Sequence, residues 1–193
     1  MKRLLCTVLL AGSLFGADAD LNFNNVVTIF SDRGELSVAT GVKVGKDLIM
    51  TCRHLFDDAN MSNVVLMDFD ETKKYVAPYV VAQKKDLDIV LLKVHGAHFK
   101  SHFELSKTEP KIGDIIYTMG MPFGRVISSS GHITKVTDTQ VSFLADSDFG
   151  DSGGPLLNEM GELIGIINLA VMNKKNKVVA VVATRASTIF GSK

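Results

Sequence analysis

The chain is divided along most of its length into short runs rich in β-branched residues, and clusters of turn residues separate these runs. Such runs are typical of strands, and clusters such as residues 31–34 (Ser-Asp-Arg-Gly) and 45–47 (Gly-Lys-Asp) are typical of the turns between them. Only the tail, residues 185–190, has a helical spacing, which predicts a short final helix. The sequence therefore predicts an all-β fold.

The predicted strands fall into two sets of six, and a polar segment at residues 96–113 separates the sets. Two sets of this size favour two packed six-stranded antiparallel barrels, at about residues 24–100 and 110–185, over a sandwich with one core. The first set comprises 26–30, 36–44, 48–51, 64–67, 75–82 and 89–94, and the second comprises 115–119, 126–130, 133–136, 140–144, 163–171 and 178–183.

The first 19 residues have the pattern of a secretory signal peptide. A basic start is followed by an apolar run at 4–15 and by Ala-Asp-Ala at 17–19, which fits a cleavage site. The run is shorter than the roughly 20 residues that span a bilayer, although an uncleaved anchor is the alternative. We therefore expect a mature domain at 20–193, exported to a bacterial periplasm or secreted, with no stable membrane insertion.

Charge and cysteine content limit the function classes further. Lys plus Arg and Asp plus Glu each number 21, so the chain carries no net charge that would attract nucleic acid. Only Cys52 remains after the predicted cleavage, which excludes an internal disulfide from the mature domain. A free cysteine is more often a small buried hydrophobe than a nucleophile, and we expect that role for Cys52.

Ser152 is the candidate nucleophile because glycines surround it in Gly-Asp-Ser-Gly-Gly-Pro, residues 150–155. Gly150 permits a backbone twist through which its own amide and that of Ser152 could converge as an oxyanion hole. Gly153 and Gly154 would let neighbouring strands approach the serine closely.

His54 is the candidate base because it follows an apolar predicted strand, and Asp88 is the candidate acid because it precedes a buried one. The order His, Asp, Ser is that of chymotrypsin rather than of subtilisin or the α/β-hydrolases. Asp86 is a rival to Asp88, whereas Asp57 and its neighbour at 58 follow the histidine too closely to orient it and suit a solvated loop.

Residues 51–54 (Thr-Cys-Arg-His), 88–92 (Asp-Ile-Val-Leu-Leu) and 150–156 resemble the three signature blocks of trypsin-like serine peptidases. Segments 113–134 and 156–166 resemble those on either side of the nucleophile in the bacterial HtrA (DegP-like) protease domain. The resemblance covers roughly residues 25–190 and implies a chymotrypsin-like fold.

The chain departs from the HtrA pattern in two ways. HtrA proteins usually carry a PDZ domain after the protease, and here we expect none. Asp151 stands where HtrA proteins usually have Asn. In trypsins this aspartate pairs with a newly cut N-terminus that has no counterpart here, so either another donor satisfies Asp151 or the loop stays mobile until substrate arrives.

The resemblance also suggests where substrate would bind. Asn168, Leu169 and Ala170 should form the edge strand to which a substrate adds by backbone pairing. Asp146 occupies the position where trypsins select Arg or Lys, whereas HtrA proteins prefer small aliphatic residues. Bulky valines at 181 and 182 favour the aliphatic preference, so the specificity stays open.

His95, His98 and His102 have spacings that could suit a metal, but the connector around them holds little else that ligates one, so a solvated linker is favoured. The basic run at 174–177 suits a hairpin tip. We expect no cofactor and no metal.

The sequence thus indicates an exported serine endopeptidase that acts on polypeptides, including unfolded ones, through an acyl-enzyme intermediate. It could form oligomers. The alternative is a non-catalytic or zymogen-like binder of unfolded chains that keeps the protease fold.

Overall fold

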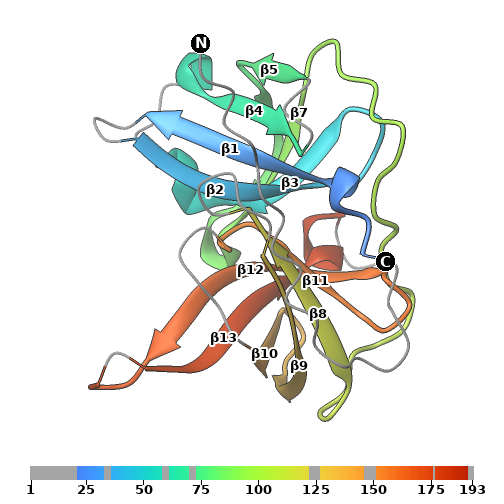
Figure 1. The fold of residues 1–193 in the computed structure, drawn as a ribbon, viewed down its shortest axis with the longest axis vertical. Coiled ribbons are helices and arrows are strands. Elements are labelled where there is room, and N and C mark those ends of the chain that lie inside the picture. The colour runs from blue at the N-terminus through green and yellow to red at the C-terminus, as the bar shows by residue number, and fades with distance from the viewer. Residues whose placement is uncertain are drawn as a thin grey trace, which may run out of the picture.

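The computed structural model describes residues 21–32, 36–57, 61–69, 73–121, 127–145, 151–175 and 177–190. They form two β-sheet units packed on each other, and their helical structure is limited to short 3-10 turns (Figure 1). One of these turns is the predicted final helix, at Ala186–Phe190. The all-β, chymotrypsin-like architecture is confirmed. The predicted signal peptide lies outside the described residues, among which no helix is long and apolar enough to cross a membrane.

The first unit is a curled sheet of seven antiparallel strands. Its strands are β1 (Val26–Asp32), β2 (Leu36–Lys43), β3 (Leu48–Cys52), β4 (Val65–Asp68), β5 (Lys74–Val76), β6 (Tyr79–Lys84) and β7 (Ile89–Lys93), in the order β5-β4-β1-β2-β3-β7-β6.

The seventh strand arises because the predicted strand 75–82 is broken in two. Ala77 takes a left-handed conformation with φ 50°, and Pro78 has no N–H to donate to a ladder. β5 and β6 therefore separate and form the two edges of the sheet.

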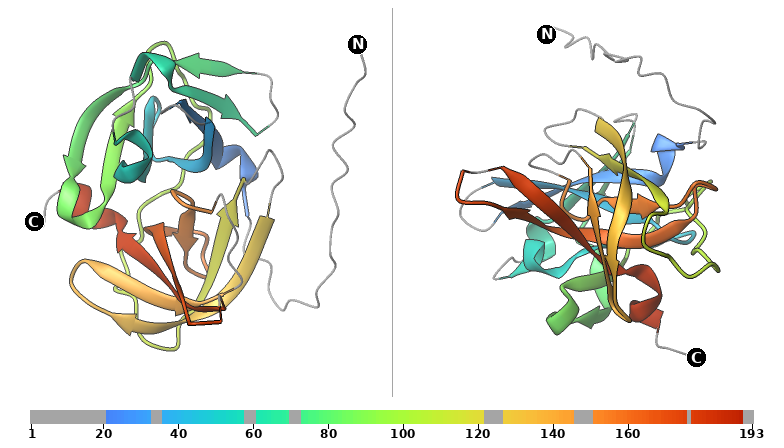
Figure 2. Two further views of the ribbon diagram at one scale, coloured as in Figure 1. Left: turned by 90° about the vertical axis from the view of Figure 1, so that its left-hand side faces the viewer. Right: turned by 90° about the horizontal axis from the view of Figure 1, so that it is seen from below.

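The second unit is a closed barrel (Figures 1 and 2). It has six strands, the number that the sequence predicts. Its strands are β8 (Ile115–Gly120), β9 (Ile127–Val136), β10 (Gln140–Leu144), β11 (Pro155–Leu157), β12 (Leu163–Met172) and β13 (Val178–Arg185). Two predicted strands merge into β9, whereas β11 was not predicted. Merging is possible because Gly131 has no side chain: a Cβ there would lie 1.8 Å from the carbonyl oxygen of Leu144.

The largest apolar cluster lies where the two units meet. Met50 and Ile89 of the first unit pack in it with Met119, Leu157 and Ile166 of the second. All five are at most 1% exposed, and each such side chain contributes about 1.5–3 kcal/mol on burial. One further cluster fills the interior of each unit. Apolar packing therefore fixes the position of one sheet against the other. The candidate residues His54, Asp88 and Ser152 lie near this boundary.

β12 and β13 form a long hairpin that projects from the second unit (Figure 1). Its tip is closed by Asn173, whose side-chain oxygen accepts the N–H groups of Lys175 (2.8 Å) and Lys177 (3.1 Å). The predicted hairpin tip at 174–177 is confirmed for its described residues.

Candidate active site

His54 and Asp88 are brought together by the pairing of β3 with β7. Cys52, the last residue of β3, pairs with Ile89, the first residue of β7. His54 follows in a 3-10 turn at Arg53–Phe56, and Asp88 directly precedes β7. The strand register therefore places the two side chains at the same end of the sheet.

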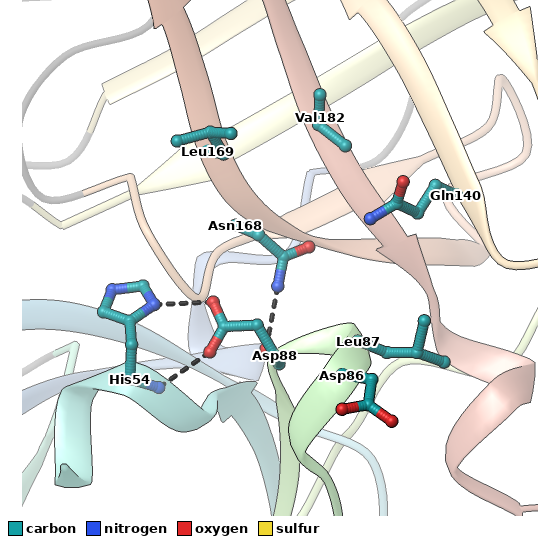
Figure 3. Close-up of a pocket in the computed structure, with 8 residues that line it drawn as sticks. All are labelled: His54, Asp86, Leu87, Asp88, Gln140, Asn168, Leu169 and Val182. Atoms are coloured by element: carbon teal, nitrogen blue, oxygen red, sulfur yellow. Dashed lines mark hydrogen bonds and ion pairs between the residues drawn. The ribbon is translucent and has the colours of Figure 1, made fainter.

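Both carboxylate oxygens of Asp88 bond to His54. Oδ2 lies 2.6 Å from His54 Nδ1, and Oδ1 accepts the His54 backbone N–H at 2.7 Å (Figure 3). Partial burial alone would raise the pKa of Asp88, but these hydrogen bonds outweigh it and hold the pKa below its ordinary value. An ionised carboxylate at Nδ1 leaves Nε2 as the nitrogen that can accept a proton.

The rival carboxylates are placed differently. Asp86 lies in the 3-10 turn at Lys85–Leu87, two residues before Asp88 in the chain, and lines a cavity that His54 and Asp88 also line. The backbone N–H and Nδ1 of His54 bond to Asp88. Asp57 is not simply solvated as expected: it forms an ion pair with Arg53, one turn earlier.

Ser152 lies in a tight turn that contacts both units. Its carbonyl oxygen accepts the Thr40 N–H of β2 at 3.0 Å, and the Gly153 N–H donates to Ile167 of β12 at 2.8 Å. Gly153 has φ 83°, and a Cβ on it would lie 2.1 Å from both the Thr40 carbonyl oxygen and Thr51 Oγ1. The prediction that Gly153 permits close approach is confirmed. Thr51 is three residues before His54, so the serine turn packs beside the strand that leads to the histidine.

Asp151 is buried, with 5% of its surface exposed, and it packs on β8. A Cβ on Gly120 would lie 2.0 Å from Asp151 Oδ1, so the carboxylate occupies the space that a side chain would need. Gly154 donates its N–H to the Asp151 carbonyl at 2.8 Å and closes the turn. The described part of this loop, from residue 151 onward, is thus closely packed against β8.

A cavity of about 430 Å³ opens beside the histidine and aspartate. Five of the side chains that line it are polar or charged and three are apolar (Figure 3). It is lined by His54, Asp86, Leu87, Asp88, Gln140, Asn168, Leu169 and Val182.

The predicted substrate strand borders this cavity. Asn168, Leu169 and Ala170 belong to β12, which pairs with β13 along its length but with β11 only at Leu163–Ile166. Leu169 is 57% exposed. Of the two valines expected near the specificity pocket, Val181 is buried in the barrel interior and Val182 lines the cavity.

Two predicted site residues, Gly150 and Asp146, lie outside the described residues. The convergence of the Gly150 and Ser152 amides and the side-chain preference attributed to Asp146 therefore stay predictions.

Cys52 is buried beneath the pair, as predicted. Its thiol donates to the Ile167 carbonyl at 2.9 Å, and burial, followed by the nearby Asp88 carboxylate, raises the pKa of the thiol well above its ordinary value. Cys52, His54 and Asp88 are the one group of three potential metal ligands among the described residues, with ligand atoms within 4.8 Å of one another. A buried protonated thiol and a histidine already bonded to a carboxylate make a poor metal site. Of the three connector histidines considered as metal ligands, His102 has its Nε2 3.3 Å from Glu104 Oε1.

Sequence reasoning missed the side-chain contacts that support the acid. Asn168 was assigned to substrate only, yet its side chain donates to the Asp88 carbonyl, and Thr184 Oγ1 donates to the Leu87 carbonyl. A lone amide within an apolar strand was the available signal for Asn168. Thr184 is 97 residues from Leu87, and no local pattern predicts that contact.

A trypsin-like peptidase domain matches residues 39–166. A probable periplasmic serine endoprotease DegP-like of Pseudomonas putida is 31% identical over 142 residues, covering 67% of this chain and 28% of that protein. The serine endoprotease DegS of Salmonella typhimurium is 29% identical over 133 residues, covering 63% of this chain and 36% of that protein. The chain thus spans about a third of the length of these relatives.

Solved structures share the fold. The active form of the Rv3671c protease of M. tuberculosis matches with a TM-score of 0.74 at 21% identity, covering 87% of this chain and 78% of that chain. A serine endoprotease of Yersinia pestis matches with a TM-score of 0.72 at 21% identity, covering 85% of this chain and 59% of that chain. With its domain match, its fold and its His54–Asp88 pair, the chain belongs to the trypsin-like peptidase family.

Proposed function

We propose that this protein is an exported serine endopeptidase in which Ser152 is the nucleophile, His54 the general base and then acid, and Asp88 the orienting carboxylate. The observation that carries the proposal is the bond of 2.6 Å between His54 Nδ1 and Asp88 Oδ2 in a chain of the trypsin-like family. A serine hydroxyl is a weak nucleophile unless a positioned base takes its proton. The carboxylate of Asp88 positions the His54 imidazole for that role.

The reaction would run through an acyl-enzyme. His54 Nε2 takes the Ser152 Oγ proton as Oγ attacks the peptide carbonyl, and it returns that proton to the leaving amine. Water then attacks the ester by the same route. The amides of Gly150 and Ser152 would stabilise the oxyanion, and one such donor is worth about 3 kcal/mol. Asp88 stays ionised throughout, consistent with its lowered pKa.

The substrate class follows from the edge of β12. Beyond Ile166, this strand pairs only with β13 among the described strands, so an extended polypeptide could add along Asn168–Ala170. Backbone pairing of this kind needs an extended chain, which favours unfolded substrates. Export is supported by the predicted leader at 1–19 and by the name of the P. putida relative, a periplasmic protease.

Hydrolysis of unfolded casein tests the proposal. The wild type should release peptides, and Ser152→Ala should lose this activity while keeping the wild-type circular dichroism spectrum. Equal cleavage by both proteins contradicts the assignment. Binding of casein without cleavage by the wild type supports the alternative, a non-catalytic binder with the protease fold.

A further inference from the structure

Asn168 lies at an irregularity in the second barrel. Its neighbours Ile167 and Leu169 pair with Ala183 and Val182 of β13, and the register shifts between these two pairs. Asn168 is therefore the extra residue of a β-bulge. Bulges turn a side chain out of the alternation of the strand, and they are frequent beside active sites.

The bulge directs the Asn168 amide toward the aspartate in the other unit. Asn168 Nδ2 donates to the Asp88 carbonyl oxygen at 2.8 Å (Figure 3). Asn168 Oδ1 accepts the Thr184 N–H at 2.6 Å. With both of its functional atoms bonded, the amide is held in one orientation. Its partner Asp88 belongs to the first unit, so this contact crosses the boundary between the two sheets.

A second bond from the same barrel reaches the neighbouring peptide. Thr184 Oγ1 donates to the Leu87 carbonyl at 2.6 Å. The carbonyls of Leu87 and Asp88 are thus both held by side chains of the second unit, one from β12 and one from β13.

The peptide held in this way has an unusual conformation. Asp88 has φ 52° and ψ 44°, the left-handed region, which costs a residue other than glycine roughly 1–2 kcal/mol. Such conformations persist where surrounding contacts over-determine them. The direction of the Asp88 side chain depends on this backbone, and both of its oxygens are aimed at His54.

We propose that Asn168, assisted by Thr184, is a positioning residue: it holds the Leu87–Asp88 turn from the opposite sheet so that the Asp88 carboxylate stays aligned with His54. The inference rests on the proposed function for its kinetic consequence. It makes the alignment of the acid and base depend on the docking of the two sheets. Asn168 contributes through its side chain, whereas substrate would pair with its strand through the backbone.

Asn168→Leu tests this role because leucine keeps the shape of asparagine and removes its hydrogen bonds to Asp88 and Thr184, together with the weaker one to Cys52 Sγ at 3.7 Å. We expect kcat on a peptide substrate to fall about 10- to 100-fold with KM within about twofold of the wild type, since the reacting groups are misplaced while the substrate strand remains. The downfield proton resonance of the His54 Nδ1–H···Asp88 bond should shift or broaden.

The matched control is Asn158→Leu in the same barrel. Asn158 also holds a turn by its side chain, accepting the N–H groups of Met160 and Glu162, but its bonds do not reach the His54–Asp88 pair. This variant should lose stability while keeping kcat and the resonance. If Asn168→Leu does not fold, Thr184→Val gives the same test on the second bond, and Thr184→Ser, which retains the hydroxyl, should restore wild-type behaviour.

A fall in kcat and a changed resonance with Asn168→Leu, absent in Asn158→Leu, support the inference. Wild-type kcat and resonance in Asn168→Leu, or identical behaviour of the two variants, overturn it. If the wild-type protein cleaves nothing, the proposed function fails, and the resonance alone decides the positioning role because it needs no turnover.

Discussion

The His54–Asp88 pair and the Ser152 turn are held by different kinds of contact. The pair relies on polar side chains: both Asp88 oxygens bond to His54, and Asn168 bonds to the Asp88 backbone. The serine turn relies on backbone bonds and on the absence of side chains, since a Cβ on Gly153 would overlap Thr40 and Thr51. The pair should therefore be sensitive to a change of hydrogen-bonding atom, and the turn to an added methyl group.

The largest effect should come from Asp88→Asn. The amide keeps the shape of the carboxylate, so the fold should persist, but it favours the wrong histidine tautomer and cannot stabilise the imidazolium. We expect kcat to fall by about 10⁴-fold. The measurement is peptidase activity with circular dichroism as the control for folding, and Asp86→Asn is the comparison. A larger loss in Asp86→Asn would assign the role to the rival carboxylate.

Gly153→Ala should break the serine turn. The added Cβ would lie 2.1 Å from the Thr40 carbonyl oxygen at a φ of 83°, so we expect a loss of about 2–5 kcal/mol in the free energy of unfolding. Gly96→Ala is the control, because Gly96 has a similar φ of 73° and no atom of the described residues lies within 4 Å of the added Cβ. That variant should lose only about 1–2 kcal/mol. Equal losses in urea denaturation would show that steric contact is not what constrains the turn.

Thr51→Val should weaken the serine turn by less. It removes one buried hydrogen bond, from Thr51 Oγ1 to the Thr40 carbonyl at 2.8 Å, with little change in shape. We expect a loss of about 1 kcal/mol in the free energy of unfolding. Thr28→Val is the control, because among the described residues the buried Thr28 hydroxyl contacts only a weak acceptor, Met121 Sδ, at 3.7 Å. A cost for Thr28→Val as large as that for Thr51→Val would contradict this reading.

The smallest effect is the pH dependence of stability that comes from the His54–Asp88 pair. The pKa of Asp88 is lower in the folded chain, so its contribution to stability is complete above the unfolded value of about 3.9 and is lost as pH falls through the folded value. We expect the stability of the wild type to approach that of Asp88→Asn between about pH 5 and pH 3. The effect is modest because 30% of the Asp88 side chain is exposed. A constant difference across this range would show that the carboxylate is not stabilised by the fold.

In both the His54–Asp88 pair and the Ser152 turn, the sequence predicted the features that depend on local patterns. His54, Asp88 and the close packing at Gly153 follow from local patterns: a residue at the end of an apolar strand, or glycines around a serine. The division of 75–82 into two strands had a local signal in Pro78, which cannot donate to a ladder, whereas the left-handed Ala77 had none. The contact of Asn168 with Asp88 required a bulge and the docking of two sheets, which are properties of tertiary structure. The short β11 was hidden because its three residues, Pro155–Leu157, lack the length and alternation of a strand signal.

The His54–Asp88 pair and the Ser152 turn should act together, with Ser152 activated by His54. The most direct test is reaction with a fluorophosphonate probe, followed by peptide mapping in a mass spectrometer. The wild type should carry a single adduct on Ser152, formed much more slowly in His54→Ala and absent in Ser152→Ala. A folded wild type that forms no adduct, or an adduct on Ser152 that forms equally fast without His54, would show that His54 does not activate Ser152.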